Sequence, residues 1–241
     1  MALRDAYLDL LYGGSCVGCA RPGRALCTAC AAALPTGART AWPDPAPTGL
    51  VRPVAAAPYD GTVKAMVLGL KERRRLPLVR PLGLLLAAAC AEATTDVCGP
   101  LVLVPVPSRP SSVRERGLDS TAALTAVAAR VLRSGGADVT VARLLRTRPG
   151  LVDQAGLSHA ERAANLAGSL AAPAVGVRRL ARRRTHARVV VCDDVLTTGA
   201  TAREAQRALE AVGLTVAAIA AVAATPRRFA HPGIGWRASG P

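Results

Sequence analysis

From residue 54 onward, short apolar runs alternate with stretches whose apolar residues recur at helical spacing. A short apolar run bounded by glycine or proline predicts a buried strand, and recurrence every three or four residues predicts a helix. We therefore expect strands at 101–106, 139–145, 189–192 and 214–221, and helices at 63–70, 78–92, 120–133, 158–166 and 200–212. Continuous apolar strands that alternate with helices predict an α/β fold, with a parallel sheet covered on both faces.

Two segments precede this alternating domain, which we place at residues 54–225. Residues 1–34 begin with a short amphipathic helical pattern and then carry four cysteines. Residues 35–53 are rich in proline and glycine, a composition that is typical of a linker. Residues 146–186 are polar and irregular, and residues 226–241 form a basic tail. The chain is thus expected to contain a cysteine unit, a linker, one α/β domain and a tail.

Composition narrows the possible partners without fixing one. Of the 241 residues, 51% are hydrophobic and 20% are charged, which excludes a mostly disordered protein. A formal charge of +15 favours an anionic partner, such as a phosphorylated small molecule, a nucleic acid or an acidic protein. All the basic side chains except Lys64 and Lys71 are arginines, and alanine is abundant, so a biased genome explains part of this charge. An aromatic content of 2% argues against base stacking on aromatic rings.

Membrane insertion and secretion are not expected from the hydropathy pattern. The longest uncharged apolar run, at 211–225, has about 15 residues, fewer than the ~20 that a spanning helix needs. Asp5 and Asp9 interrupt the region where a signal peptide would have its apolar core. We therefore expect a cytoplasmic protein, in which cysteines serve as metal ligands or core residues more often than as disulfides.

The four cysteines of the first segment form two Cys-x2-Cys pairs, Cys16 with Cys19 and Cys27 with Cys30. Two such pairs can place four thiolates tetrahedrally around zinc, and a segment this short has no room for its own core. Four cysteine ligands leave no open position, so the predicted zinc is structural. A redox dithiol and a cluster that no longer binds metal are the alternatives. The other cysteines, Cys90, Cys98 and Cys192, are isolated and expected to fill the core.

The most informative segment is V-V-V-C-D-D-V-L-T-T-G-A-T-A, at residues 189–202. An apolar strand ends in Asp193 and Asp194, and a threonine- and glycine-containing bend then enters a helix. In an open parallel sheet, ligands bind beyond the carboxyl ends of the strands. The bend supplies amides, hydroxyls and a helix N-terminus for a phosphate, and the carboxylates suit the hydroxyls of a ribose or a bridging magnesium ion. The alternative is a capped turn without a ligand.

A second strand leads into an arginine-rich loop at residues 107–117. Arginine binds phosphate oxygens in a bidentate manner, so this loop could hold a pyrophosphate. In an arginine-rich chain it could equally be a solvated loop. Its expected position, at the same edge of the sheet as the acidic pair, favours the binding role.

The segment at 189–202 resembles the phosphoribosyl pyrophosphate-binding motif of type I phosphoribosyltransferases. Further segments resemble the ComF family of phosphoribosyltransferase-like proteins, which includes the competence protein of bacterial DNA uptake. These segments, which occur in the family's order, are the cysteine cluster, residues 59–71, residues 105–117 and residues 146–166. The family's arginine–glycine motif continues with a hydrophobic residue and Asn-Gln, whereas here Leu118 precedes Asp119 and Ser120. Asp119 still suits the N-cap of the next helix.

The resemblance implies a role for each matching position. Catalysis would fall to the ribose-binding pair and to two arginines of a mobile loop: Asp193, Asp194, Arg148 and Arg162. The 5′-phosphate would be bound by Thr197, Thr198, Gly199, Ala200 and Thr201. Pyrophosphate would be bound by Ser108, Arg109, Arg114, Arg116 and Gly117. Magnesium would bridge the pyrophosphate and ribose oxygens.

Three functions remain open from the sequence. The first is a phosphoribosyltransferase with an unidentified acceptor, and the second is a sensor that binds phosphoribosyl pyrophosphate without turnover. The third is a non-catalytic, zinc-containing competence or DNA-processing factor that binds single-stranded DNA or a helicase partner. The acidic pair favours the first two, for which its carboxylates must face a cavity. The basic charge and the cysteines favour the third.

Overall fold

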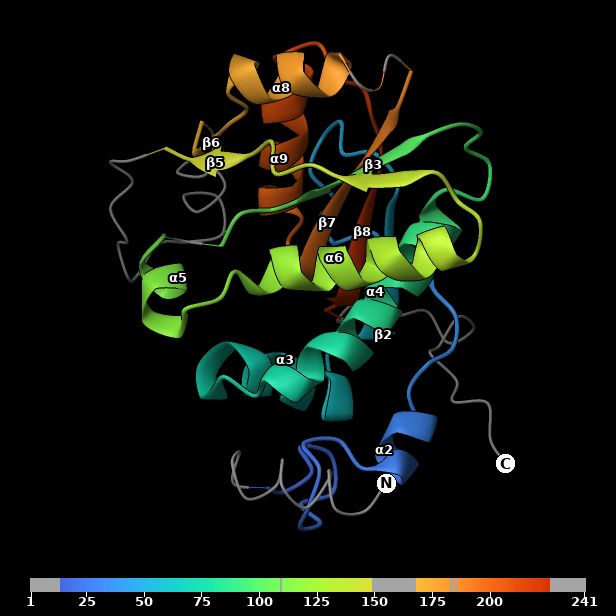
Figure 1. Cartoon of the computed structure of the whole chain (residues 1–241), viewed down its shortest axis with the longest axis vertical. Helices are drawn as coiled ribbons and strands as arrows, with labels where there is room; N and C mark the ends of the chain where they lie inside the picture. Colours follow the sequence, from blue (N-terminus) through green and yellow to red (C-terminus); the bar gives the residue numbers. More distant parts are fainter. Residues whose placement is uncertain (1–13, 109, 149–167, 183, 185, 226–241) are drawn as a thin grey trace.

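A computed structural model describes residues 14–108, 110–148, 168–182, 184 and 186–225. At its centre lies a six-stranded sheet in the order β1-β2-β8-β7-β3-β4 (Figure 1). The strands are β1 (Arg39–Thr40), β2 (Pro53–Pro58), β8 (Val216–Ala224), β7 (Arg188–Leu196), β3 (Leu101–Pro105) and β4 (Val139–Val141). All neighbours pair in parallel except β1, which is antiparallel to β2. A separate antiparallel pair consists of β5 (Arg146–Thr147) and β6 (Leu170–Ala171).

Helices cover both faces of the main sheet, and each face has its own hydrophobic core. On one face, α3 (Gly61–Arg73), α4 (Val79–Ala93) and α6 (Ser120–Ser134) contribute residues to the first core. On the other face, α9 (Ala200–Glu210) belongs to the second core. Both cores consist almost entirely of leucine, valine and alanine, as the low aromatic content requires. The other helices among the described residues are α2 (Thr28–Ala32), η1 (Leu76–Leu78), α5 (Pro110–Arg116) and α8 (Ala174–Ala181).

The expected α/β class and its mostly parallel sheet are confirmed, but several elements differ from the sequence prediction. Strand β2 was not predicted, because its prolines and alanines do not resemble a β-branched run. Residues 35–53, expected as a linker, contain β1 and place Leu50 in the second core. Helix α8 lies in a region expected to be irregular. The helix expected at 158–166, the amphipathic start and the basic tail fall outside the described residues.

The order of the strands creates a switch in direction between β3 and β7. The chain leaves β3 through α6 toward β4, at one edge of the sheet, and leaves β7 through α9 toward β8, in the opposite direction. The crossover helices α6 and α9 consequently lie on opposite faces. The loops that follow β3 and β7 diverge at this point, which is where open parallel sheets bind ligands.

One stretch, Leu76–Ala93, is long and apolar enough to cross a membrane, with 18 residues and a mean hydropathy of 1.5. Half of it is buried inside the protein, and it contains α4, a central helix of the first core. Its hydropathy thus has a sufficient explanation in the packing of the fold. Length and composition alone make it weak support for a membrane span.

Candidate functional site

Strand β7 extends beyond its neighbour β3 at the carboxyl edge of the sheet. Cys192 pairs with Pro105, the last residue of β3, so Asp193 and Asp194 lie past the end of that strand. The amide of Val106 donates to the carbonyl oxygen of Cys192 at 2.9 Å, which keeps the chain after β3 beside the acidic pair. The two loops therefore leave the sheet next to these carboxylates.

Two side chains from the first face hold Asp194. The Lys71 ammonium on α3 lies 2.6 Å from Asp194 Oδ2, and the Thr121 hydroxyl on α6 donates to the same oxygen at 3.4 Å. Asp193 Oδ1 accepts the amide of Asp194 at 2.8 Å. Only 9% of Asp193 and 6% of Asp194 is exposed. The pair therefore does not face an open cavity, which differs from the expectation from the sequence. The sequence could not show that Lys71 covers Asp194 and compensates its charge.

The two carboxyl groups have different electrostatic surroundings. Burial, and after it the nearby charge of Asp194, raise the pKa of Asp193 to about 7, although Lys71 and the hydrogen bond from the Asp194 amide oppose the rise. A carboxyl group that titrates near neutrality donates a hydrogen bond when protonated and accepts several when ionised. Such perturbed groups concentrate at binding and catalytic sites.

The bend after β7 has the backbone arrangement expected for a phosphate site. Within the described part of the chain, the amides of Thr197, Thr198 and Gly199 donate no hydrogen bond to another described residue. Gly199 adopts a φ of 74° as the N-cap of α9, a conformation that favours glycine. The Thr198 hydroxyl accepts the amide of Ala200 at 3.4 Å. These amides and the positive end of α9 can stabilise an anion.

Gly199 has a second role that the sequence did not reveal. A Cβ atom at this position would lie 2.9 Å from Pro43 Cγ and 3.2 Å from Leu50 Cδ2. The missing side chain therefore makes room for the segment before β2. The same segment binds α9, because Gln206 Oε1 accepts the amide of Val51 at 3.0 Å.

The loop after β3 is ordered around Asp119. As predicted, Asp119 is the N-cap of α6, where its side chain accepts the amide of Ala122 at 3.3 Å. The same carboxylate accepts the Ser108 hydroxyl at 3.1 Å and binds Arg143 at 2.5 Å. Ser108 is thus turned toward Asp119, and part of the expected pyrophosphate loop forms the short helix α5.

The remaining predicted ligand residues are less well gathered. Arg114 is exposed on α5, and Gly117 follows that helix with a φ of 71°. Arg148 is exposed beside the separate β5–β6 pair, where its amide donates to Ser169. Thr201 lies in the first turn of α9. Arg109, Arg162 and the side chain of Arg116 fall outside the described part of the structure.

Lys71 and Thr121 belong to this site although the motif analysis did not assign them. For Lys71 the sequence did carry a signal, because it is one of only two lysines among 31 basic residues. Its distance from the acidic pair in the chain hid the contact, which depends on α3 and β7 meeting across the first core. Thr121 follows the Asp119 cap and carries no separate signal.

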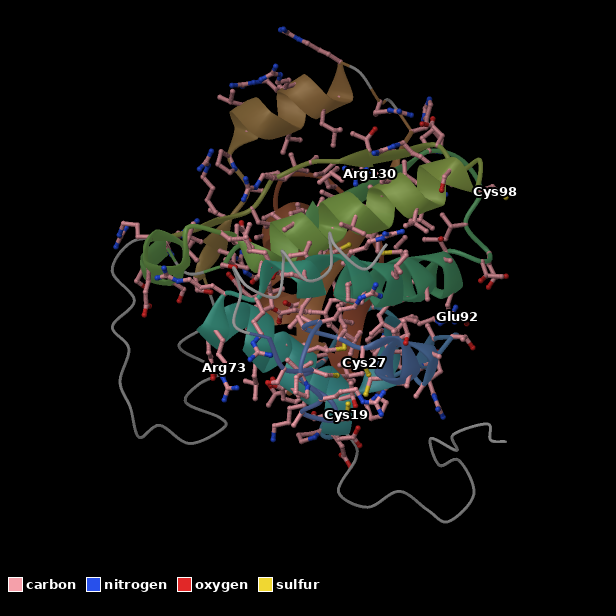
Figure 2. The ribbon with its side chains drawn as sticks, turned by 60° about the horizontal axis from the view of Figure 1, so that its bottom comes forward. Cys19, Cys27, Arg73, Glu92, Cys98 and Arg130 are labelled. Carbon is pink, nitrogen blue, oxygen red and sulfur yellow. The ribbon has the colours of Figure 1, made fainter. Side chains whose placement is uncertain are left out.

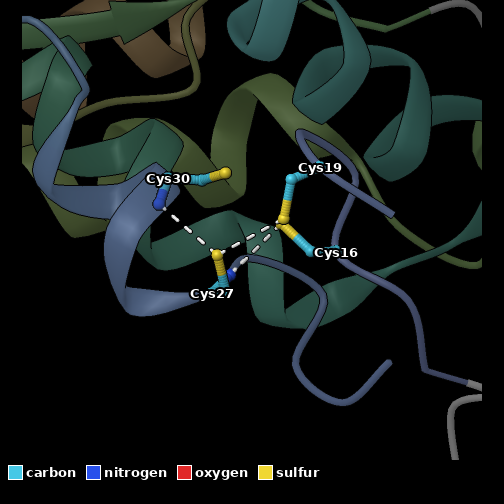
Figure 3. Close-up of side chains that lie close together, drawn as sticks. All are labelled: Cys16, Cys19, Cys27 and Cys30. Carbon is cyan, nitrogen blue, oxygen red and sulfur yellow. Dashed lines mark hydrogen bonds between the residues drawn. The ribbon is translucent and has the colours of Figure 1, made fainter. Parts of the chain in front are cut away.

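The four cysteines predicted as ligands come together (Figure 3). All four sulfurs lie within 4.8 Å of one another, and Cys19 Sγ is 3.7 Å from Cys27 Sγ. Tetrahedral zinc with Zn–S bonds of about 2.3 Å requires sulfur separations of about 3.8 Å, so the donors fit. Backbone amides also donate to sulfur: Gly18 and Cys27 donate to Cys16 Sγ, each at 3.4 Å. The group can therefore hold a metal ion such as zinc.

The thiols of this cluster differ in acidity. Burial opposes ionisation of Cys16, but backbone hydrogen bonds, chiefly from Cys27 and Cys19, lower its pKa to about 6. Hydrogen bonding with the Cys27 and Cys16 sulfurs raises the pKa of Cys30 to about 12. Four sulfurs at this spacing cannot all ionise without a compensating cation. The arrangement is therefore suited to a cationic metal.

The three isolated cysteines have separate environments. Cys90 and Cys192 are buried in the first core, with their sulfurs 3.8 Å apart. Cys98 is exposed, which corrects the expectation that it fills the core.

No protein-family model matches the chain, and no curated protein sequence matches it at a significant level.

Proposed function

We propose that the chain is a phosphoribosyltransferase-like protein of the ComF family that binds phosphoribosyl pyrophosphate or a related sugar phosphate. The observation that supports this most strongly is the position of the acidic pair. Asp193 and Asp194 lie near the carboxyl end of the central strand β7, at the switch point of the sheet, and a short bend after Leu196 leads to the N-terminus of α9.

In this proposal the bend and the carboxylates bind opposite ends of one ligand. The amides of Thr197, Thr198 and Gly199 bind the 5′-phosphate, and the pentose hydroxyls donate to Asp193 and Asp194. Because both carboxylates are buried, the site must open when the ligand binds, and the ligand must draw the Lys71 ammonium away from Asp194. A negatively charged phosphate offers Lys71 an alternative partner, which offsets the loss of its ion pair.

Transfer would break the bond between ribose C1 and a pyrophosphate oxygen and form a bond from C1 to the acceptor. Magnesium, when bound with the ligand, supplies charge neutralisation for the leaving pyrophosphate. The chain's own contribution is to orient the pentose and to present arginines to the pyrophosphate. Arg114 is the described arginine of the expected pyrophosphate loop. In the cysteine unit, zinc would have a structural role only.

Calorimetric titration with phosphoribosyl pyrophosphate and magnesium tests the site. We expect binding by the natural protein and loss of at least ~10-fold in affinity for Asp193→Asn combined with Asp194→Asn, since each carboxylate forms charge-assisted hydrogen bonds. Asp138→Asn is the matched control, because Asp138 lies at the amino end of β4, whereas the acidic pair lies toward the carboxyl ends of the strands. Unchanged affinity in a folded double variant would refute the assignment.

Release of pyrophosphate then separates an enzyme from a sensor. Incubation with magnesium, phosphoribosyl pyrophosphate and candidate acceptors yields pyrophosphate only if transfer or hydrolysis occurs. Binding without release supports the sensor. Either result is compatible with a role in DNA uptake, which the ComF resemblance suggests.

The alternative is a non-catalytic factor that binds single-stranded DNA or a helicase partner. One observation favours it: Arg178 and Arg179 on α8, and Arg182 directly after it, are exposed. Counterion release from phosphates would make such binding fall steeply with salt. Replacing these three arginines with glutamine should abolish DNA binding under this alternative and leave sugar-phosphate binding unchanged under the first.

A further inference from the structure

We propose that the cysteine unit, residues 14–34, positions Lys71 on Asp194, so that metal binding at the four cysteines controls access to the acidic pair. As a statement about regulation of the ligand site, this inference rests on the proposed function. Its structural part, the link between the cysteines and Lys71, can be measured without any ligand.

The cysteine unit contacts α3 near both of its ends. A Cβ atom on Gly18 would lie 3.0 Å from the side chain of Thr62, in the first turn of α3. A Cβ atom on Gly69, in the last turns of α3, would lie 3.3 Å from Val17 Cγ1. The two glycines thus allow the unit to lie directly against the helix. Figure 1 shows this unit and α2 below α3, away from the sheet.

A polar contact continues this interface past the end of α3. The Arg75 guanidinium donates to the carbonyl oxygen of Ser15 at 2.6 Å. Arg74, the C-cap of α3, has a φ of 51° and donates to the carbonyl oxygen of Glu115 on α5. The last turn of α3 is therefore fixed on one side by the cysteine unit and on another by the loop after β3.

Lys71 lies in this last turn, two residues after Gly69. Its ammonium is 2.6 Å from Asp194, and its side chain is 31% exposed. A long side chain with this exposure keeps a fixed position only if its helix does, because ordering it costs rotamer entropy. The contacts of Val17 and Ser15 contribute to fixing that helix end.

The cysteine unit has little hydrophobic core of its own. Among described residues 14–34, Cys16 is the only buried hydrophobic residue. A segment without a core folds on the binding energy of its metal and unfolds when the metal is removed. Loss of the metal would therefore withdraw Val17 and Ser15 from α3 and release Lys71 from Asp194. By linkage, any ligand that prefers one position of Lys71 changes metal affinity by the same factor.

The two lysines of the chain provide the measurement. Lys64 also lies on α3, is exposed, and does not contact a carboxylate in the described residues. Acylation of the full chain with an activated ester, quantified by mass spectrometry, reports both amines in one sample. With zinc bound, Lys71 should react more slowly than Lys64. Removing zinc with a chelator should accelerate Lys71 by about fivefold, the factor for opening a partly exposed ion pair, and leave Lys64 unchanged.

A variant that spares the metal ligands isolates the contact. Val17→Ala removes the atoms that touch Gly69 and should raise Lys71 reactivity while one zinc per chain is retained. Val175→Ala is the matched control, because Val175 is 70% exposed on α8. Its reactivity pattern should equal that of the natural protein.

Three results would overturn the inference. The first is an unchanged rate at Lys71 after metal analysis shows that zinc is gone. The second is an equal rise at both lysines, because this means that α3 opens as a whole. The third is a Val17→Ala protein with the natural Lys71 rate. Absence of phosphoribosyl pyrophosphate binding would refute the proposed function and leave these measurements intact, so the two failures are distinguishable.

Discussion

Replacing Asp193 with asparagine should stabilise the protein at alkaline pH. The pKa of about 7 lies roughly three units above the ordinary value of 3.8, mainly because the carboxyl is buried. The folded state therefore keeps a proton between about pH 4 and pH 7 that the unfolded state has lost. Stability consequently falls as pH rises through this window, and the penalty is complete above pH 7. Asparagine avoids it, and its oxygen can still accept the Asp194 amide.

The size of the effect follows from the shift. Three units correspond to about 4 kcal/mol at ~1.4 kcal/mol per unit, an upper bound for a group that interacts with other charges. At pH 5 the unfolded state is already largely ionised, so about 1–2 kcal/mol of this penalty is present there. The advantage of Asp193→Asn should therefore be about 2–3 kcal/mol larger at pH 8 than at pH 5.

Urea unfolding of the natural protein and Asp193→Asn at both pH values measures this difference. Asp138→Asn is a control of opposite sign, because its hydrogen bond with Arg184 lowers the pKa of Asp138. That ion pair contributes stability at neutral pH, which is lost as the pH falls through the folded pKa. An advantage of Asp193→Asn that is the same at pH 5 and pH 8, or a variant less stable than the natural protein at pH 8, would refute the reasoning.

Two further substitutions test the scaffold of the site by thermal unfolding. Asp119→Ala removes the cap of α6 and the contacts with Ser108 and Arg143, and should lower the free energy of unfolding by about 1–2 kcal/mol. Asp119→Asn should retain most of this stability, because asparagine is also a good N-cap. Equal losses in both variants would show that the cap is not responsible. Gly83→Ala would place a Cβ atom 2.5 Å from Val127 Cβ between α4 and α6, and should cost about 1–3 kcal/mol. Val127→Gly in the same chain removes both close atoms of Val127, so the added Gly83→Ala should then cost less, and an undiminished cost would contradict the contact.

The sequence alone predicted the features that depend on local pattern and spacing. Periodicity was enough for the central strands and the helices of both faces, because buried strands and amphipathic helices differ in where apolar residues recur. The paired Cys-x2-Cys motifs predicted the metal-binding group, since residues so close in the chain can only meet locally. The Asp119 cap was predicted for the same reason.

Only the tertiary structure decided how distant residues meet at the acidic pair. Lys71 and Thr121 reach Asp194 from separate helices, and their contacts depend on how α3 and α6 pack across the first core. Burial of the pair, and with it the raised pKa of Asp193, follows from that packing. The contact of the cysteine unit with α3 is equally non-local (Figure 2 places Cys19 and Cys27 near the ribbon that carries Arg73). Charge compensation and burial are properties of the folded surroundings, and a linear motif does not contain them.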